Sequence, residues 1–362
     1  MTETTAIKNN SPCSARFRVA GDLIIHEKLL NCALRPDGSY DFRLHFAQIK
    51  DILENADYTI MNLETTVGMV GDLPYSGYPR FNTPEALLDA LRDAGVDFLT
   101  LANNHILDRG IEGLKMTADK VEERGFDFGG VNRSPEGGQE PVAVDICGIR
   151  TAFLCYTGIM NVVNSEESLT ESVERAHAQG VKTLQHADFA ADVTGARKAG
   201  AELVIALPHW GEEYQRSPED ETVVLAKKMI AAGVDVILGS HSHMVQPVEF
   251  LKAETENGGT RTGLVAYCLG NFISNQSARY TDSGMVLDFT VRRMEGGGFL
   301  TENVSILPTY CWRQEDRVQT LCSKRYLNAP PEGMDTDTWL RLKESYEELR
   351  ELIDSSFPMT AE

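Results

Sequence analysis

Residues 236–243 read Val-Ile-Leu-Gly-Ser-His-Ser-His. An apolar run typical of a buried strand ends at Gly239, and two histidines two positions apart, His241 and His243, follow it. If the backbone stays extended there, side chains two positions apart point to the same side, so both imidazoles converge just beyond the strand. Open α/β sheets place their sites at such strand ends. The pattern therefore indicates a divalent metal site, and the alternative is a polar pair in an exposed loop.

Five strand-like runs in the chain end on a carboxylate, a carboxamide or an imidazole. These end residues are Asp22, Glu64, Asn104 with His105, His209, and His241 with His243. Each has an ordinary explanation alone, because an Asp after Gly is usually a turn residue and a lone His is usually a loop or core residue. The carboxyl ends of parallel strands share one edge, however, so the set can meet. Oxygen and nitrogen donors without thiolate favour Mn, Fe or Zn, and carboxylates can bridge two ions about 3.5–4 Å apart.

Strand-like runs alternate with segments of helical periodicity. Strands are predicted at 15–21, 57–64, 96–101, 141–146, 150–157, 202–207, 236–238, 247–251, 262–269, 285–291 and 300–307. Helices are predicted at 42–56, 85–94, 111–124, 188–199, 219–232 and 336–353. The polar segment 158–185 is interpreted as an irregular insertion near the site.

This order of elements indicates an α/β fold. Alternating strands and helices predict βαβ units and a largely parallel sheet, and the later run of strands predicts a second, more antiparallel sheet, with helices outside both. No linker divides the chain. We therefore expect one domain over residues 1–362, with a core at about 15–310 and a C-terminal helical extension at about 330–356.

Composition limits the classes of partner. The chain has 362 residues, 42% of them hydrophobic, and a formal net charge of −20, which argues against nucleic acid or an anionic membrane surface as a main partner. A small anionic substrate stays compatible, since a bound cation reverses the local field. Seven scattered cysteines indicate reduced thiols. The sequence shows no signal peptide or membrane-spanning run, so we expect a soluble cytoplasmic protein.

Six short motifs occur in an order that resembles one known family. They are Gly21-Asp22, Asn-Leu-Glu at 62–64, Ala-Asn-Asn-His-Ile-Leu-Asp at 102–108, His-Trp-Gly-Glu-Glu-Tyr at 209–214, Gly-Ser-His-Ser-His-Met-Val-Gln at 239–246 and Tyr-Cys-Leu-Gly-Asn-Phe at 267–272. Together they resemble the bacterial poly-γ-glutamate capsule-biosynthesis (CapA-type) family. The resemblance extends from residue 16 to about 290. It implies a calcineurin-like metallophosphatase fold, a four-layer αββα sandwich with two central mixed sheets.

The resemblance also implies two divalent metal ions, Mn, Fe or Zn, held by residues at the strand ends. In that assignment one ion is held by Asp22 and His243, Glu64 bridges both ions, and the second ion is held by Asn104, His209 and His241. The two histidines of residues 236–243 are therefore expected to serve different ions.

Four further residues receive roles from the resemblance. His105 is expected over the substrate, as proton donor to the leaving group or as an oxyanion partner, with Asp108 orienting it. His26 follows Asp22 by four residues, whereas metallophosphatases place a ligand histidine two residues after the aspartate, so its role as a ligand stays open. Arg80 lies in a loop that matches the family and is a candidate for anion binding. A surface salt bridge is the alternative for Arg80.

These observations predict a metal-dependent hydrolase that acts on a phosphoester or an amide through a metal-activated water. The expected substrate is a small anionic or γ-glutamyl-type molecule. The alternative is a non-hydrolytic role in binding or assembling a poly-γ-glutamate capsule polymer, because a family resemblance does not determine function. Capsule proteins of this kind usually carry a membrane anchor and this sequence shows none, which favours the hydrolase.

Overall fold

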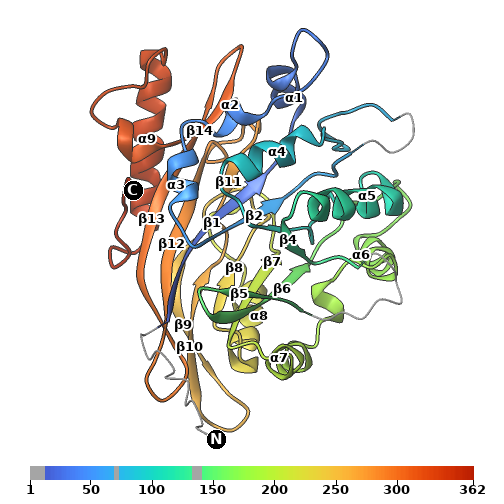
Figure 1. The fold of residues 1–362 in the computed structure, drawn as a ribbon, viewed down its shortest axis with the longest axis vertical. Coiled ribbons are helices and arrows are strands. Elements are labelled where there is room, and N and C mark those ends of the chain that lie inside the picture. The colour runs from blue at the N-terminus through green and yellow to red at the C-terminus, as the bar shows by residue number, and fades with distance from the viewer. Residues whose placement is uncertain (1–12, 69–72, 133–140) are drawn as a thin grey trace, which may run out of the picture.

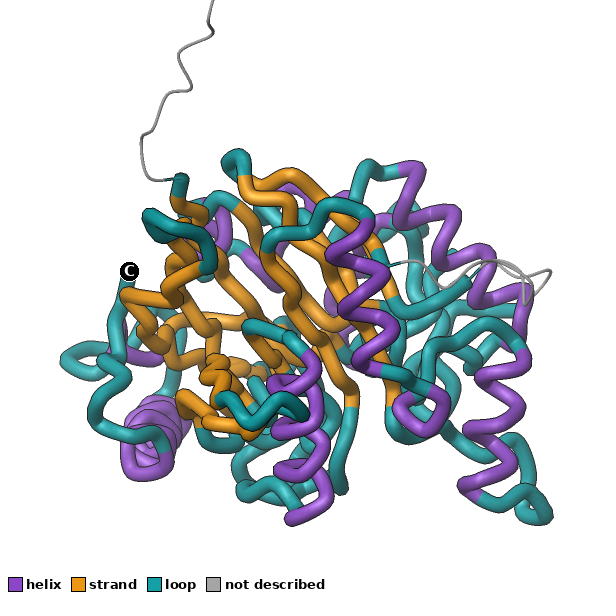
Figure 2. Tube along the Cα trace, turned by 90° about the horizontal axis from the view of Figure 1, so that it is seen from below, coloured by secondary structure: helices purple, strands orange, loops and turns teal. Residues whose placement is uncertain are grey.

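Two β-sheets stack face to face at the centre of the molecule, with helices on the outer face of each (Figures 1 and 2). The computed structural model describes residues 13–68, 73–132 and 141–362. In these ranges both sheets are mixed, which confirms the expected four-layer αββα architecture. The predicted single domain, residues 1–362, includes ranges that the structure does not describe and stays a prediction.

The first sheet joins early and late parts of the chain, in the order β14-β13-β12-β1-β2-β3-β4, with β11 also paired to β1. Its strands are β1 (Ser14–Leu23), β2 (Tyr58–Leu63), β3 (Phe98–Thr100), β4 (Asp127–Gly129), β11 (Asn271–Ile273), β12 (Ser283–Arg293), β13 (Phe299–Arg313) and β14 (Val318–Cys322). Strands β1 to β4 run parallel, whereas β12, β13 and β14 are antiparallel to their neighbours.

The second sheet has the order β5-β6-β7-β8-β10-β9. Its strands are β5 (Val142–Ile146), β6 (Ile149–Thr157), β7 (Leu203–His209), β8 (Val236–Leu238), β9 (Val248–Glu254) and β10 (Thr260–Ala266). The four central strands are parallel, and both edge strands are antiparallel. The expectation that the late strands form a separate antiparallel sheet is therefore wrong. They pair instead with the open edges of two existing sheets, which leaves fewer unpaired backbone groups exposed.

Helices cover the two outer faces. They are α1 (Glu27–Ala33), α2 (Arg43–Phe46), α3 (Lys50–Glu54), α4 (Ala86–Asp93), α5 (Gly110–Glu123), α6 (Leu169–Ala178), α7 (Phe189–Lys198), α8 (Asp220–Ala232) and α9 (Thr336–Leu352), with 3-10 turns η1 (Leu184–His186) and η2 (Ser323–Tyr326). The predicted helix at 42–56 is two short helices, α2 and α3. Among the described helices, none combines the length and the apolar composition that crossing a bilayer requires.

Side chains of central strands such as β2, β7 and β8 are buried on both faces, which explains why these strands appear as nearly continuous apolar runs in the sequence. On β1, Phe17 and Val19 enter the layer between the sheets, while Ala20 and Leu23 pack against the helices. On β6, Phe153 belongs to the same inter-sheet layer. The change of face from Val19 to Ala20 follows from the period of two along a strand. Leu23 lies beyond the register shift between Val19 and Asp22, which explains why it packs on the same side as Ala20.

Glycines allow the loops at the strand ends to pack against one another. A Cβ atom on Gly239, directly after β8, would lie 1.9 Å from the carbonyl oxygen of Tyr267 and 2.5 Å from Nε1 of Trp210. A Cβ atom on Gly21, within β1, would lie 1.8 Å from the carbonyl oxygen of Gly270. Neither position has room for a side chain. The carboxyl ends of β1 and β8 are therefore held close to the strands beside them.

We expect Gly239→Ala to lower the free energy of unfolding by roughly 1–3 kcal/mol or more, because the added methyl group collides with backbone. The matched control is Gly195→Ala in α7, where an added Cβ meets no atom within 4 Å. That variant is expected to gain up to about 1 kcal/mol from helix propensity. Urea unfolding of both variants is the measurement. A Gly239→Ala protein as stable as the wild type contradicts the packing argument.

Candidate metal centre

The oxygen donors of the predicted site come from the first sheet. Asp22 lies near the end of β1, where the pairing with β2 shifts register, and Glu64 directly follows β2. Asn62 orients both carboxylates: its Nδ2 donates to Asp22 Oδ1 at 2.8 Å and lies 3.3 Å from Glu64 Oε2. Asn104 follows β3. All of these side chains are buried.

The nitrogen donors come from the second sheet. His209 ends β7, and His241 and His243 lie in the loop that follows β8. The expectation of an extended backbone through this loop is wrong, because His241 has φ 101° and His243 has φ 60°, both left-handed. Residues with a Cβ seldom adopt this region, and they do so chiefly where surrounding structure enforces it, often at functional sites. The left-handed turns direct the two imidazoles to different partners.

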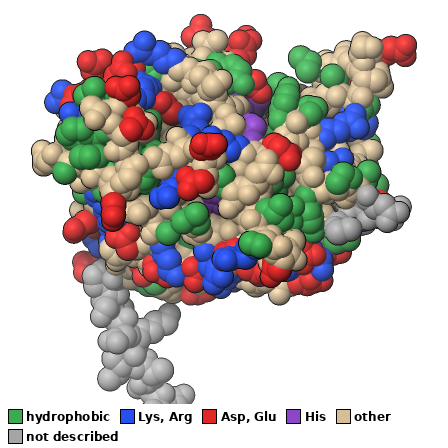
Figure 3. Space-filling view, turned by 90° about the horizontal axis from the view of Figure 1, so that it is seen from above, with side chains coloured by type: hydrophobic (Ala, Val, Ile, Leu, Met, Phe, Trp, Pro, Cys, Tyr) green, Lys and Arg blue, Asp and Glu red, His purple; other side chains and the backbone are tan. Residues whose placement is uncertain are grey.

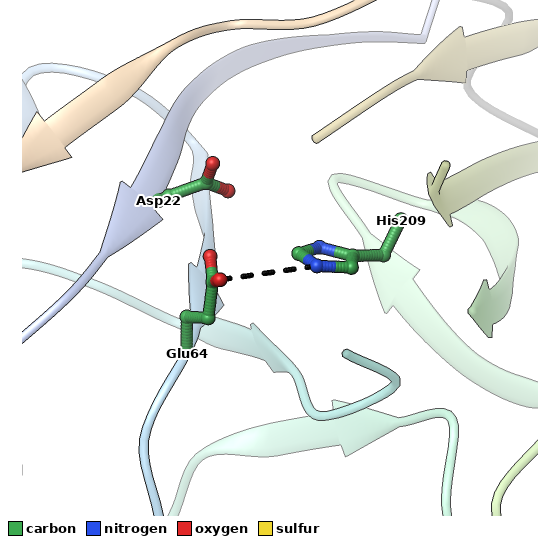
Figure 4. A group of neighbouring side chains, drawn as sticks. All are labelled: Asp22, Glu64 and His209. Carbon is green, nitrogen blue, oxygen red and sulfur yellow. Dashed lines mark ion pairs between the residues drawn. The ribbon is translucent and has the colours of Figure 1, made fainter. Parts of the chain in front are cut away.

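One group of donors converges on Nε2 of His209. This atom lies 2.9 Å from Asn104 Oδ1 and 3.1 Å from His241 Nδ1. It also lies 3.9 Å from Glu64 Oε1, the contact drawn as a dashed line in Figure 4. Donor atoms of one ion, each about 2.1 Å from it, are separated by roughly 3–4 Å. The first group therefore has the spacing of a ligand set.

A second group forms around His243. Its Nδ1 lies 3.2 Å from Asp22 Oδ2, and its Nε2 lies 3.9 Å from Glu64 Oε1. Glu64 Oε1 is therefore close to both groups. The structure brings together six of the predicted ligands in this way, with His241 beside His209 and His243 beside Asp22. That the two histidines serve different ions stays a prediction.

An unpartnered buried atom tests whether the site fits a cation. Glu64 Oε1 is buried and has no hydrogen-bond partner. Such an atom in a native protein needs an explanation, since an unsatisfied carboxylate oxygen is costly to bury. Oxygen and nitrogen atoms of Asp22, Glu64 and His209 also lie within 4.8 Å of one another. A bound divalent cation satisfies all three, so the residues present fit a metal.

The pKa shifts of the cluster agree with that fit. Burial, together with the nearby carboxylate of Asp22, raises the pKa of Glu64 well above its usual value. Burial lowers the pKa of His241 to about 3 and moves the pKa of His209 in the same direction, so both imidazoles are neutral near pH 7. Metal ligation requires neutral imidazoles and an ionised carboxylate. A cation reverses the shift at Glu64 and leaves the imidazoles ready to bind.

A cavity of about 990 Å³ opens onto the cluster. Figure 3 shows this face, with histidine atoms visible below the surrounding surface. His105 lies in the cavity wall, and its Nδ1 is 2.7 Å from Asp108 Oδ2. Asp108 Oδ2 also accepts the backbone N–H of Phe81 at 2.7 Å, and the Phe81 ring meets the His105 imidazole edge to face. His105 is thus held by one carboxylate and one aromatic ring.

Two predicted residues lie in the cavity wall, apart from the ligand groups. Nδ1 of His26 accepts the backbone N–H of Asn275 at 3.1 Å, and among the described residues His26 forms no hydrogen bond or ion pair with Asp22 or Glu64. Arg80 is exposed, and its Nη2 donates to the carbonyl of Val163 at 3.4 Å. The described residues include no ion pair of Arg80, so the surface salt bridge considered above is not formed there.

Sequence reasoning missed three residues that support the site: Asn62, Ser240 and Asn161. Oγ of Ser240 lies 2.9 Å from Nδ1 of His209 and can orient that ring. Asn161 accepts a hydrogen bond from Nδ2 of Asn104 at 3.1 Å. It precedes α6, in the segment expected to be irregular. The capping box formed by Ser168 and Glu171 was the available signal for that helix.

Comparison with known proteins gives consistent matches. The family model "Bacterial capsule synthesis protein PGA_cap" matches residues 16–276. The chain is 27% identical over 293 residues to capsule biosynthesis protein CapA of Bacillus anthracis, covering 79% of this chain and 66% of that protein. It is 25% identical over 263 residues to PGA biosynthesis protein CapA of Bacillus subtilis (strain 168), covering 72% and 64%. The chain thus spans slightly less than two thirds of the length of these relatives.

Two further matches differ in coverage or identity. A probable polyglutamine synthesis accessory protein of Mycobacterium tuberculosis is 29% identical over 235 residues, covering 59% of this chain and 57% of that protein. Among solved structures, the NAD nucleotidase NadN of Haemophilus influenzae overlaps 94% of this chain and 68% of its own, with 13% identity and a TM-score of 0.47. An overlap at that TM-score supports no argument about activity.

We expect His241→Ala to lose bound metal, because it removes a donor from the group around His209. Elemental analysis after purification without chelator is the measurement. The control is His186→Ala, which removes an exposed imidazole paired with Glu174 outside the cluster. Equal metal content in both variants contradicts the assignment of His241.

Metal affinity is expected to rise with pH and then level off. The raised pKa of Glu64 means that its proton competes with the cation below that pKa, whereas above it the carboxylate is already ionised. Binding should therefore release a proton at the lower pH and none at the higher. Calorimetry in two buffers of different ionisation enthalpy counts the released protons. Affinity and proton release that stay constant across pH contradict this role for Glu64.

Proposed function

The chain belongs to the bacterial capsule synthesis protein family, and from that premise we propose that it is a metal-dependent hydrolase of phosphoester or amide bonds. One observation supports this proposal most. A buried carboxylate oxygen without a hydrogen-bond partner, Glu64 Oε1, lies between two groups of donors at the floor of a large cavity. Carboxylate, carboxamide and imidazole donors around a shared carboxylate are typical of two-metal hydrolases.

The proposed ligands form two sets that share Glu64. Asp22, Glu64 and His243 would hold one divalent cation, and Glu64, Asn104, His209 and His241 would hold the other. Bound divalent cations supply Lewis-acid chemistry, since they lower the pKa of a coordinated water and stabilise oxygens that gain charge in the transition state. The protein contributes the fixed positions of these donors. Asn62 and Ser240 hold them in place through hydrogen bonds.

His105 is proposed as the proton donor to the leaving group. The carboxylate of Asp108 accepts a hydrogen bond from Nδ1–H of His105. Nε2, on the other side of the ring, is then left to exchange a proton with a bound substrate. The Phe81 ring restricts rotation of the imidazole. Asp108 is a positioning residue in this scheme. A histidine held in this way contributes typically 10²–10⁴-fold to the rate.

Arg80 is proposed to bind an anionic group of the substrate. It is exposed in the cavity wall, where its Nη2 donates to the carbonyl of Val163 at 3.4 Å. The proposed substrates are small anionic or γ-glutamyl-type molecules. Cations near the floor and Arg80 near the mouth offset the negative charge of the chain as a whole, −20 at pH 7.

The names of the two Bacillus relatives describe biosynthesis of a capsule or of PGA, which favours one alternative: binding or assembling a capsule polymer without hydrolysis. The same metal centre serves either function. A measurement of turnover distinguishes hydrolysis from binding or assembly of the polymer. A metal-loaded protein that binds poly-γ-glutamate but cleaves none of the substrates below supports the alternative and contradicts the hydrolase.

The substrate panel is p-nitrophenyl phosphate, bis-p-nitrophenyl phosphate and γ-glutamyl p-nitroanilide, each with Mn²⁺, Fe²⁺ and Zn²⁺. We expect turnover of at least one substrate that disappears on chelation and returns when metal is restored. Release of p-nitrophenol or p-nitroaniline is followed by absorbance. The result also distinguishes phosphoester from amide chemistry.

On the substrate that turns over, His105→Ala is expected to keep its metal and lower kcat by about 10²–10⁴-fold. Asp108→Asn should lower kcat less and shift its pH profile, because it alters the partner of His105 without removing the imidazole. Metal content is measured beside kcat for both variants. Loss of metal from His105→Ala places that residue among the ligands and contradicts the assignment.

A further inference from the structure

Glu213 lies at the rim of the proposed metal centre and belongs to neither of the two ligand sets. Its Oε1 is 3.9 Å from Nε2 of His243, and the same nitrogen is 3.9 Å from Glu64 Oε1. The side chain of Glu213 is 42% exposed and lines the cavity. Glu213 is therefore within the range of separations found among ligands of one ion.

Three hydrogen bonds close to Glu213 in sequence fix its loop to the histidine loop. The backbone N–H of Tyr214 donates to the carbonyl of Ser242 at 2.8 Å. The carbonyl of Gln215 accepts from Ser242 Oγ and from Gln246 Nε2, both at 3.1 Å. Tyr214 itself has φ 63°, a left-handed conformation for a residue with a Cβ. These contacts hold Glu213 beside His243 independently of any ion.

The group around His243 is short of one ligand without Glu213. Asp22, Glu64 and His243 supply three donors, whereas the group around His209 has four. His26 is the residue that the family pattern offers for the missing position. Its Nδ1 instead accepts the N–H of Asn275, and its ring packs edge to face on Phe81. Nδ1 of His26 is therefore engaged elsewhere, whereas Glu213 Oε1 lies 3.9 Å from His243 Nε2.

We propose that Glu213 is a further metal ligand, bound to the cation that Asp22, Glu64 and His243 hold, in the position that His26 does not fill. This inference rests on the metal-dependent function proposed above. With three carboxylates and one imidazole, this site has more hard (oxygen) donors than the other. Carboxylates suit Mn²⁺ and Mg²⁺, whereas sites richer in imidazole suit Fe and Zn. The site near Glu213 is therefore assigned to a hard divalent cation such as Mn²⁺, and the site near His209 to Fe or Zn.

Titration of the full chain with Mn²⁺, followed by the electron paramagnetic resonance signal of free Mn²⁺, tests the proposal without an activity assay. Glu213→Gln keeps the shape of the side chain and removes its charge. We expect it to weaken one Mn²⁺ site by at least about 10–100-fold and to leave the other unchanged. Glu213 is partly exposed, so the variant should fold, and circular dichroism checks that it does.

Two controls isolate the role of Glu213. Glu212→Gln changes the neighbouring exposed carboxylate, whose backbone N–H donates to Glu219, and it should bind Mn²⁺ like the wild type. His26→Ala should also keep its Mn²⁺ affinity. Zn²⁺ competition adds a second readout, since Glu213→Gln should lose more Mn²⁺ affinity than Zn²⁺ affinity.

The outcomes separate this inference from the proposed function. Wild-type protein that binds no Mn²⁺, Fe²⁺ or Zn²⁺ overturns both. Wild-type protein that binds metal, together with a Glu213→Gln variant that binds Mn²⁺ equally well, overturns the role of Glu213 alone. Loss of one Mn²⁺ site in His26→Ala but not in Glu213→Gln assigns the further ligand to His26. That result also overturns the role of Glu213.

Discussion

The structure depends on one junction, where oxygen donors from the first sheet meet imidazole nitrogens from the second. The carboxylates and the carboxamide come from the ends of β1, β2 and the loop after β3, and the imidazoles come from the end of β7 and the loop after β8. Glu64 lies where the two sheets meet, close to His209 on one side and His243 on the other. An unpaired buried carboxylate is costly, so this junction needs a cation or a proton. The proposed metal centre therefore also links the two halves of the sandwich.

The backbone around this junction is unusually constrained. His241, His243 and Tyr214 adopt left-handed conformations, and Gly21 and Gly239 pack directly against neighbouring carbonyl groups. Such conformations persist only where the surrounding structure enforces them. Here the hydrogen bonds between the two loops, and the pairing of β8 with β7 and β10, supply that enforcement. Ligand positions are thus determined before any ion binds, which reduces the reorganisation that binding requires.

Metal ligation and proton donation are proposed for different parts of the molecule. Most of the proposed ligands are buried at the strand ends, whereas His105 and Asp108 lie in the cavity wall beside Phe81. Asn161, from the segment before α6, contacts Asn104 and approaches His105, and so connects the two parts. The segment 158–185, which the sequence predicted to be irregular, is for this reason part of the site. Loops on a rigid scaffold commonly carry such residues.

The sequence by itself determined the fold class and the residues that come together, because buried strands appear as apolar runs and their polar ends are visible as exceptions to that pattern. The family was indicated by the resemblance of six short motifs. It also predicted that His241 and His243 serve different partners. Tertiary structure alone decided how the late strands are shared between the two sheets, since a strand of given sequence can pair with either open edge. It alone showed that His26 faces Asn275, that Asn62 and Asn161 support the ligands and that Glu213 lies beside His243. Those facts depend on distances between segments that are far apart in the chain, and no local pattern of residues encodes them.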